Sequence, residues 1–201
     1  MILFNKVLDA DKVYVVSDMH INHKNICKGS SSWDDKSGCR DFNSLAEMND
    51  TIINNINAVV PADGILINLG DIIFGDKSKL PELLRINCKN HHLIFGNHDQ
   101  WMFDKPNALS LFSSTQFYLE FFAKMPNGQK TKVCLSHYPI KSWHDMNRGS
   151  WMLHGHCHGN IIHNQGKIID VGVDVNYFKP YSLLEIVNFM DKREIIKVDH
   201  H

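Results

Sequence analysis

Two short motifs place possible metal ligands two residues apart. Asp18 and His20 form one pair, and His156 and His158 form the other on either side of Cys157. Residues i and i+2 of an extended chain point to the same side, so each pair is expected to face one point. Cys157 should then point away and pack in the interior. Carboxylate and imidazole groups together form a donor set of intermediate hardness, which suits transition-metal ions.

Three further polar residues, Asp71, Asn97 and His137, come directly after short apolar runs. Ligands bind outside the carboxyl ends of strands in open α/β sheets, so residues at such positions are expected to converge. Any one of them alone would more often be a turn residue. Together they favour a site for two transition-metal ions, and the donor set does not suit calcium or an all-thiolate centre. The seven candidate ligands are Asp18, His20, Asp71, Asn97, His137, His156 and His158.

Short apolar segments alternate with helical patterns along the chain, which is typical of an α/β or mixed two-sheet domain. Strands are expected at 13–16, 65–69, 92–95, 116–123, 131–137, 151–153, 167–175 and 195–198. Helices are expected at 45–59, 80–88 and 182–191. Ser44 and Ser182 each precede a glutamate by three residues, a pattern that marks the first turn of a helix.

The composition fits one domain that spans residues 1–201. The formal net charge of -1 gives no overall positive field to hold the chain on long nucleic acid or an anionic membrane. No apolar run approaches the ~20 residues of a membrane-spanning helix, and charges interrupt the N-terminal segment where a signal peptide would be apolar. Five cysteines without a C-x-x-C pair fit free thiols. We therefore expect a cytoplasmic protein.

At the candidate ligands the sequence resembles the calcineurin-like metallophosphoesterase superfamily. Its motifs D-x-H, G-D, G-N-H-D/E, H and G-H-x-H all occur in order between Asp18 and His158. The segments SDMHINHKNI, LSHYPIKSW and GHCHGN look like a small single-domain bacterial and phage branch of that superfamily. The resemblance implies an α/β fold in which a two-sheet β-sandwich is flanked by helices, in four αββα layers. It also implies that the chain hydrolyses a phosphate ester.

The resemblance further implies a role for each motif residue. Asp18, His20 and His158 would hold one ion, Asn97, His137 and His156 the other, and Asp71 would bridge the two. The ions would be divalent transition metals, with Mn²⁺ favoured and Fe, Ni, Co or Zn as alternatives, and would share a hydroxide that attacks phosphorus in line. His98 would stabilise the transition state or protonate the leaving oxygen. Asp99 would either orient His98 or cap the following segment.

Four residues are candidates for substrate contact, each with a structural alternative. His23 could meet a phosphate or begin a helix, and Arg40 and Arg148 could be phosphate forks or surface ion pairs. Trp143 could stack on a base or form a packed wall. We expect a small phosphate-ester substrate, with a phosphodiester or nucleotide favoured and long nucleic acid disfavoured. The alternatives are a phosphomonoesterase, a phosphoprotein phosphatase and a non-catalytic metal-binding protein on the same fold.

Overall fold

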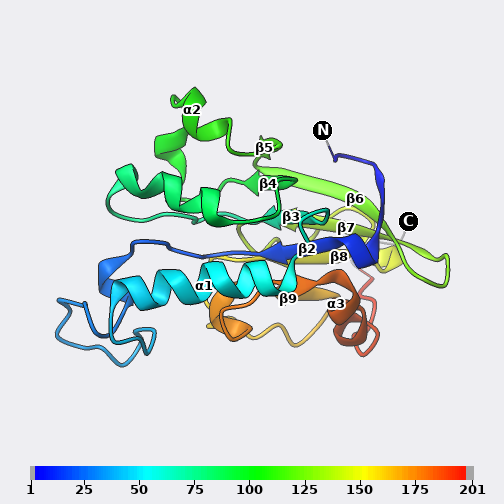
Figure 1. Ribbon diagram of the computed structural model, residues 1–201. Coiled ribbons are helices and arrows are strands. Elements are labelled where there is room, and N and C mark those ends of the chain that lie inside the picture. The colour runs from blue at the N-terminus through cyan, green and yellow to red at the C-terminus, as the bar shows by residue number, and fades with distance from the viewer. Residues whose placement is uncertain (1–2, 198–201) are drawn as a thin grey trace.

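The computed structural model describes residues 3–197, which form two five-stranded sheets packed face to face (Figure 1). The first sheet has the order β10-β2-β3-β4-β5, from Tyr181–Ser182, Val13–Val16, Ile65–Asn68, His91–Ile94 and Ser114–Gln116. The second has the order β1-β6-β7-β8-β9, from Val7–Asp9, Tyr118–Lys124, Lys130–Ser136, Trp151–His154 and Ile168–Asp170. The two-sheet sandwich expected from the sequence is confirmed.

Both sheets are mixed, but the strands that end near the candidate ligands are parallel. Strands β2 to β5 run parallel and β10 pairs antiparallel with β2. In the second sheet β7, β8 and β9 run parallel, β6 is antiparallel to β7, and β1 is parallel to β6. Because parallel strands end at the same edge, each sheet brings several strand ends together.

Alternating side chains of each strand fill different cores. Val13, Val15 and Ile67 point between the sheets and pack there with Phe121 and Leu135 of the second sheet. The intervening residues of β2 and β3 face the other way and pack against the first long helix. This period of two explains why apolar residues run continuously through strands that are buried on both faces.

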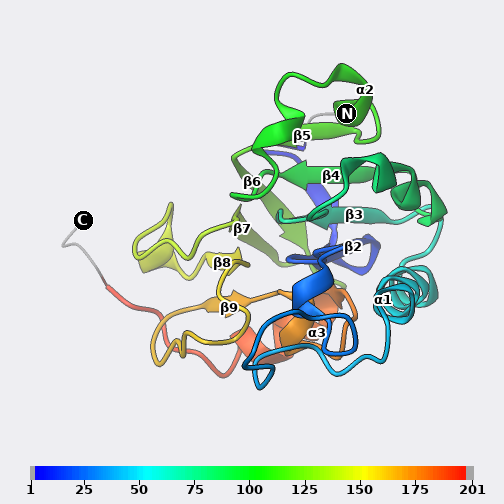
Figure 2. The same ribbon diagram turned by 90° about the vertical axis from the view of Figure 1, so that its left-hand side faces the viewer.

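Helix α1, Leu45–Val59, covers the outer face of the first sheet, where Figure 2 shows it end-on beside β2 and β3. The Ser44 hydroxyl accepts a hydrogen bond from the Glu47 amide at 3.1 Å, as the capping pattern predicts. Its apolar stripe, which includes Met48, Ile52 and Ile56, is buried. The other helices are α2, Pro106–Leu109, and α3, Leu183–Met190, which begins with a complete capping box.

The outer face of the second sheet is covered by the segment between β7 and β8. Its Trp143 and Met146 pack on Cys134 and Met152 of the sheet. The helical part of this layer is one 3-10 turn, Met146–Arg148. Figure 2 shows the segment on the far side of the sandwich from α1.

Three expected elements differ from those observed. The helix expected at 80–88 is a run of 3-10 turns, Lys77–Arg85, because Pro81 lies inside it and removes a backbone donor. The strand expected at 167–175 ends at Asp170, and a 3-10 turn, Val173–Val175, follows Gly172. No strand forms over 195–197, where Ile196 packs its side chain against the second sheet, and Val198 lies outside the described residues.

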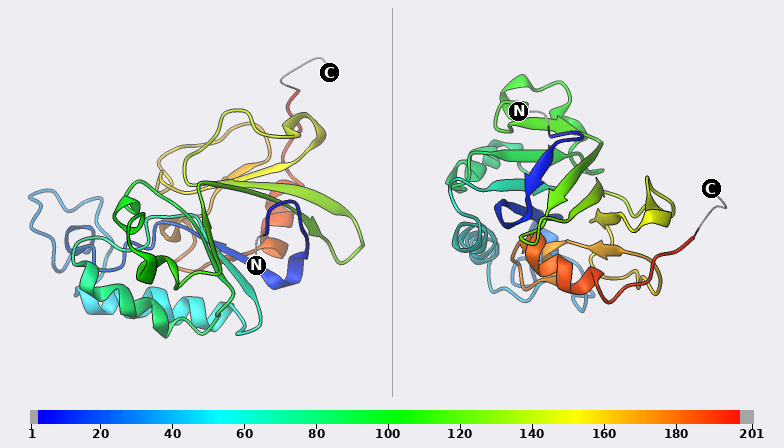
Figure 3. Two further views of the ribbon diagram at one scale, coloured as in Figure 1. Left: turned by 90° about the horizontal axis from the view of Figure 1, so that it is seen from above. Right: turned by 90° about the vertical axis from the view of Figure 1, so that its right-hand side faces the viewer.

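The strand ends gather at one end of the sandwich. Figure 3 shows the β6–β7 hairpin at one end of the molecule and the long loop before α1 at the other. Ser17, just after β2, forms a parallel bridge with Gly172, just after β9, so the two sheets are joined there. No helix within residues 3–197 is long and apolar enough to cross a bilayer.

Two buried histidines on β4 predict how stability depends on pH. The His92 ring contacts Ser114 Oγ at 2.7 Å and Asn90 Oδ1 at 2.8 Å, and burial lowers its pKa to about 4. Burial lowers the pKa of the neighbouring His91 to about 3. Both rings are therefore neutral in the folded protein at pH values at which the unfolded chain binds protons.

We predict that the free energy of unfolding falls as the pH is lowered from about 6.5 towards 4. The His92→Gln variant should lose less stability over this interval than the wild type, by on the order of 2 kcal/mol. Urea denaturation at pH 7 and pH 4.5 measures both losses. Equal losses in the two proteins would show that His92 does not contribute to the acid sensitivity.

Candidate metal centre

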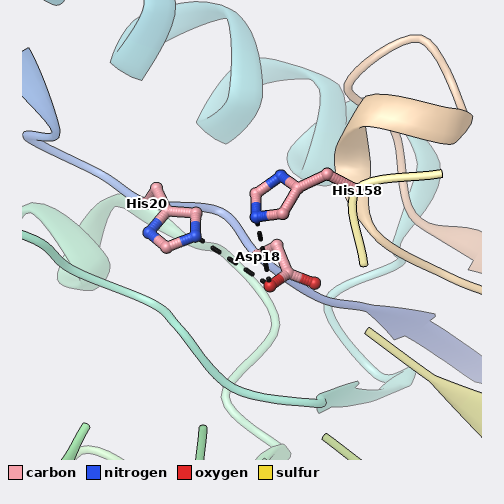
Figure 4. Close-up of side chains that lie close together, drawn as sticks. All are labelled: Asp18, His20 and His158. Atoms are coloured by element: carbon pink, nitrogen blue, oxygen red, sulfur yellow. Dashed lines mark ion pairs between the residues drawn. The ribbon is translucent and has the colours of Figure 1, made fainter. Parts of the chain in front are cut away.

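The first group of candidate ligands consists of Asp18, His20 and His158. Each offers one donor atom, and these atoms lie within 4.8 Å of one another. Asp18 Oδ1 lies 3.9 Å from His20 Nε2 and 3.8 Å from His158 Nε2. Figure 4 shows both imidazole rings turning a nitrogen towards the same carboxylate oxygen. These separations are too long for hydrogen bonds and are close to those between neighbouring ligands of one metal ion.

The second group consists of Asp71, His137 and His156, whose donor atoms also lie within 4.8 Å of one another. Asn97, the remaining candidate ligand, places its Oδ1 atom 3.0 Å from His137 Nε2. His137 Nδ1 lies 2.7 Å from the Leu69 carbonyl oxygen, which can only accept a hydrogen bond. In the neutral ring Nε2 therefore carries a lone pair that faces another acceptor oxygen.

Asp71 lies between the two groups. Its Oδ2 atom is 3.7 Å from His20 Nε2 in the first group and 3.6 Å from His137 Nε2 in the second. Its Oδ1 atom accepts a hydrogen bond from the His98 amide at 2.8 Å, which holds the carboxylate in place. One oxygen is thus fixed by the backbone and the other faces both groups of ligands.

These residues fit divalent metal ions. Among residues 3–197, nothing donates a hydrogen bond to Asp18 Oδ1, although this atom is buried. A buried carboxylate oxygen without a donor is costly unless a cation compensates it. The lone pair of His137 Nε2 faces Asn97 Oδ1, and a cation between these two atoms would likewise compensate them. Mixed imidazole and oxygen donors suit transition metals.

Electrostatics in the protein favour a cation at this point. Burial raises the pKa of Asp18 to about 7, although the charge of His158 acts in the opposite direction. Burial also lowers the pKa of His20 well below its usual value, and burial together with the nearby His137 lowers the pKa of His156. His20 and His156 are therefore favoured in the neutral form, which is the form that binds metal.

The ligand pairs converge through turns and not through extended strands. Positive φ angles between +47° and +69° occur at Asp18, His20, Asp71, His156 and His158. The expectation that the i, i+2 pairs lie on extended chain is wrong, although the side chains of each pair do converge. The Asp18 amide donates to the Gly70 carbonyl and the His20 amide to the Asp71 carbonyl, each at 2.9 Å, so the loops after β2 and β3 hold each other.

Two glycines allow backbone to approach the carboxylates. A Cβ atom at Gly155 would lie 1.9 Å from Ser17 Oγ and 2.3 Å from Asp18 Oδ2. A Cβ atom at Gly96 would lie 2.2 Å from Asp71 Oδ1. The space gained at Gly155 lets the His156 amide donate to Asp18 Oδ2 at 2.9 Å.

A sequence model of the calcineurin-like phosphoesterases matches residues 11–199, which include all of these positions. The chain belongs to the calcineurin-like phosphoesterase family. The resemblance noted from the motifs is thereby confirmed.

Two relatives and one solved structure are similar to this chain. The chain is 33% identical over 194 residues to an uncharacterized protein of Methanocaldococcus jannaschii, covering 92% of this chain and 95% of that protein. It is 28% identical over 185 residues to the Gene 66 protein of Mycobacterium phage D29, covering 81% and 87% of the two chains. A crystal structure of a protein of unknown function from Aquifex aeolicus shares the fold, with a TM-score of 0.62 at 24% identity over 88% of this chain and 98% of that one.

His98 lies beside the two groups of ligands and belongs to neither. Its side chain is 40% exposed, and its Nε2 atom is 3.9 Å from Asp71 Oδ2. The ring packs edge-on against His20 and Phe74, with centroid separations of 5.6 Å and 4.8 Å. His98 and His156 are the exposed members of the site, so the centre opens to solvent on their side.

Asp99 is buried beneath the site and holds the backbone of the Asp71 loop. Its Oδ2 atom accepts hydrogen bonds from the Asp71 and Gly96 amides at 2.8 Å, and its Oδ1 atom accepts one from Ile72 at 3.2 Å. Its side chain makes no capping bond to the 3-10 turn Gln100–Met102. Burial raises the pKa of Asp99 against the opposing effect of these bonds.

The predicted phosphate contacts of Arg40 and Arg148 are not supported. Arg40 is buried and hydrogen-bonded to Asp174 and to the carbonyls of Asp18 and Met19, so it lies behind the ligands as a structural group. Arg148 is exposed on the segment that covers the second sheet, with Asp145 at 3.5 Å.

Trp143 is a packed wall residue, which is the structural alternative to stacking on a base. Its ring is buried in the cluster on the outer face of the second sheet, and its indole nitrogen donates to the Ser150 carbonyl at 3.2 Å. Cys157 is buried, as expected, and contributes to neither group of ligands.

His23 begins the 3-10 turn Lys24–Ile26, where its Nδ1 atom accepts a hydrogen bond from the Ile26 amide at 3.3 Å. Its ring also lies beside His20, within an aromatic group that the sequence did not indicate. Its ring stacks on Phe74 at 3.9 Å and packs edge-on against His20 at 5.5 Å and Trp33 at 6.0 Å. Asp174 was also missed. It lies two residues after Gly172 in the turn that follows β9, and a carboxylate shortly after a strand and a glycine is the signal that could have indicated it.

We predict that Asp99→Asn lowers the free energy of unfolding by about 2–3 kcal/mol, because an amide replaces a carboxylate that accepts three backbone hydrogen bonds. The exposed Asp104→Asn provides a matched control, with little expected change. Denaturation in excess chelator measures stability without a contribution from metal. Unchanged stability combined with lost turnover would instead support an orienting role towards His98.

Proposed function

We propose that the protein is a dinuclear metal-dependent phosphoesterase that hydrolyses a small phosphodiester or nucleotide. The position of Asp71 Oδ2, within 3.7 Å of a histidine nitrogen from each group of ligands, carries this proposal. A single carboxylate oxygen placed this way can bridge two ions. In this assignment Asp18, His20 and His158 hold one ion, and Asn97, His137 and His156 hold the other.

The chain's own residues would prepare the reaction. Two bound ions would supply Lewis acidity and activate a nucleophile at neutral pH. Asp71 would hold both ions, and the buried Asp18 and His20 would keep water from one side of the site. His98 remains free to donate a proton to the departing oxygen or to stabilise charge on the phosphoryl group, because its side chain is exposed and outside both groups of ligands.

The aromatic group beside His98 favours a substrate with a flat leaving group. Phe74 packs between His23 and His98, and Trp33 extends this surface with 47% of its area exposed. Lys77 Nζ lies 5.9 Å from the Phe74 ring centre and adds a positive charge. An aromatic face next to a cation suits a nucleobase attached to phosphate.

The rival functions make different demands. A phosphomonoesterase or phosphoprotein phosphatase would act on terminal phosphates without preference for a base, and a non-catalytic protein would bind metal without turnover. A panel of mono-, di- and cyclic phosphate esters, assayed with Mn²⁺ and with excess chelator, separates these possibilities. Full activity after long incubation in chelator would exclude a two-metal mechanism.

We predict that Asp71→Asn loses more metal than Asp18→Asn. The bridging carboxylate serves both ions, whereas Asp18 serves one. Each variant is loaded with Mn²⁺, freed of excess metal and measured for manganese per chain. Equal metal content in the two variants would contradict the bridging assignment of Asp71.

We predict that His98→Ala retains both ions and loses on the order of 10²–10⁴-fold in kcat on an ester with an alkoxide leaving group. The loss should be much smaller on a nitrophenyl ester, because that leaving group departs as a stable anion. Equal losses on both esters with metal retained would indicate stabilisation of the phosphoryl oxygens. Loss of metal would instead make His98 a ligand.

We predict that Trp33→Ala raises the KM for nucleotide esters and leaves the KM for an aliphatic phosphodiester unchanged. Loss of stacking is worth roughly 1–3 kcal/mol per base. Leu84→Ala is the control, since Leu84 is 60% exposed. It lies beside the residues that lead into β4, and the site lies at the other end of that strand. A parallel rise on both substrates would show that Trp33 does not contact the base.

A further inference from the structure

A partly buried carboxylate lies directly behind one ligand of the first group. Asp174, in the 3-10 turn after β9, places its Oδ2 atom 2.6 Å from His158 Nδ1. The carboxylate can accept the Nδ1 proton, which leaves the Nε2 lone pair on the side of Asp18. A carboxylate behind a metal-binding histidine fixes the ring and raises the basicity of its free nitrogen.

Arg40 holds this carboxylate and the ligand loop together. Its Nε atom donates to Asp174 Oδ1 at 2.7 Å and one terminal nitrogen donates to Oδ2 at 2.8 Å. The terminal nitrogens also donate to the carbonyls of Asp18 at 2.7 Å and Met19 at 2.8 Å. With a side chain only 3% exposed, Arg40 ties Asp174 to the turn that carries Asp18 and His20.

The second group of ligands has a different support. His137 Nδ1 donates to the Leu69 carbonyl, which is a neutral acceptor. A carbonyl orients the ring but raises its basicity less than a carboxylate does. The two groups of ligands therefore differ in the residues behind them, while Asp71 is shared between them.

We propose that Arg40 and Asp174 are positioning residues that set the affinity for one ion only, the ion held by Asp18, His20 and His158. The inference rests on the proposed two-metal site. Arg40 fixes Asp174, Asp174 fixes His158, and neither residue touches the second group of ligands. Loss of the Asp174 charge should weaken binding of this ion by about 10–100-fold and leave the affinity for the other ion unchanged.

The test is a stepwise Mn²⁺ titration of the full chain after chelator treatment, with calorimetry or a competing metal indicator as the readout. Asp174→Asn keeps the size of the side chain and removes its charge. His158→Ala, which removes the ligand itself, identifies the binding step that belongs to the first group. The expected result is that Asp174→Asn weakens that same step by about 10–100-fold.

Asp170→Asn is the matched control. Asp170 is buried at the end of β9. Its carboxylate accepts hydrogen bonds from the Gly159 and Gly172 amides, and neither bond involves the ring of a ligand. It should change neither step by more than about threefold, well below the effect of removing a carboxylate behind a ligand. If it weakens the first step as strongly as Asp174→Asn does, the effect belongs to the packing of this loop and the inference is overturned.

Arg40→Lys is a second variant that keeps the buried charge and breaks the paired hydrogen bonds. It should weaken only the binding step that His158→Ala identifies, so the inference stays testable if Asp174→Asn does not fold. Unchanged affinities in a folded variant, or equal weakening of both steps, would overturn it. A wild-type chain that binds fewer than two ions would instead overturn the proposed function.

Discussion

The Asp71 carboxylate is held in one position by the backbone, and the arrangement of the whole site depends on it. The His98 amide donates to Oδ1, and the Asp71 amide donates to the buried Asp99. These two bonds leave Oδ2 facing a histidine nitrogen from each group of ligands. Because Asp99 holds three amides of two neighbouring loops, movement of either loop would disturb the oxygen that both groups share.

The ligand turns are strained, and the fold compensates for this strain. Non-glycine residues at positive φ cost on the order of 1–3 kcal/mol each, and five candidate ligands have such angles. Backbone bonds between the loops after β2 and β3 and the bridge between Ser17 and Gly172 hold these turns in place. These contacts join the two sheets at the point where the ligand side chains converge.

The sequence predicted the parts of the site that depend on local order along the chain. Polar residues after apolar strands indicated the positions of both groups of ligands, and the capping residues Ser44 and Ser182 marked the helices correctly. Short strands of two or three residues, such as β1, β5 and β10, carry too few residues for a periodic signal. The 3-10 character of 77–85 follows from Pro81, which a helical pattern of apolar residues does not reveal.

The role of Arg40 depended on a partner that no local pattern identifies. Arg40 and Asp174 are 134 positions apart in the chain, and only the folded structure brings them together. A sequence shows that an arginine can grip a carboxylate or a phosphate, but it does not show which of them is within reach. The aromatic group has the same origin, because Phe74 and His23 stack across two different loops.

The burial of Arg40 also bears on how a phosphate would be bound. A guanidinium engaged by a carboxylate and two carbonyls has little capacity left for an anionic substrate. Arg40 therefore places its positive charge behind the ligands, where it compensates Asp174, and not at the open side where His98 and His156 are exposed. At that side Lys77, beside Phe74, supplies a positive charge, and cations held by the two groups of ligands would supply more. In the proposed two-metal site, substrate binding would depend on metal binding, because the bound cations themselves would attract the phosphate.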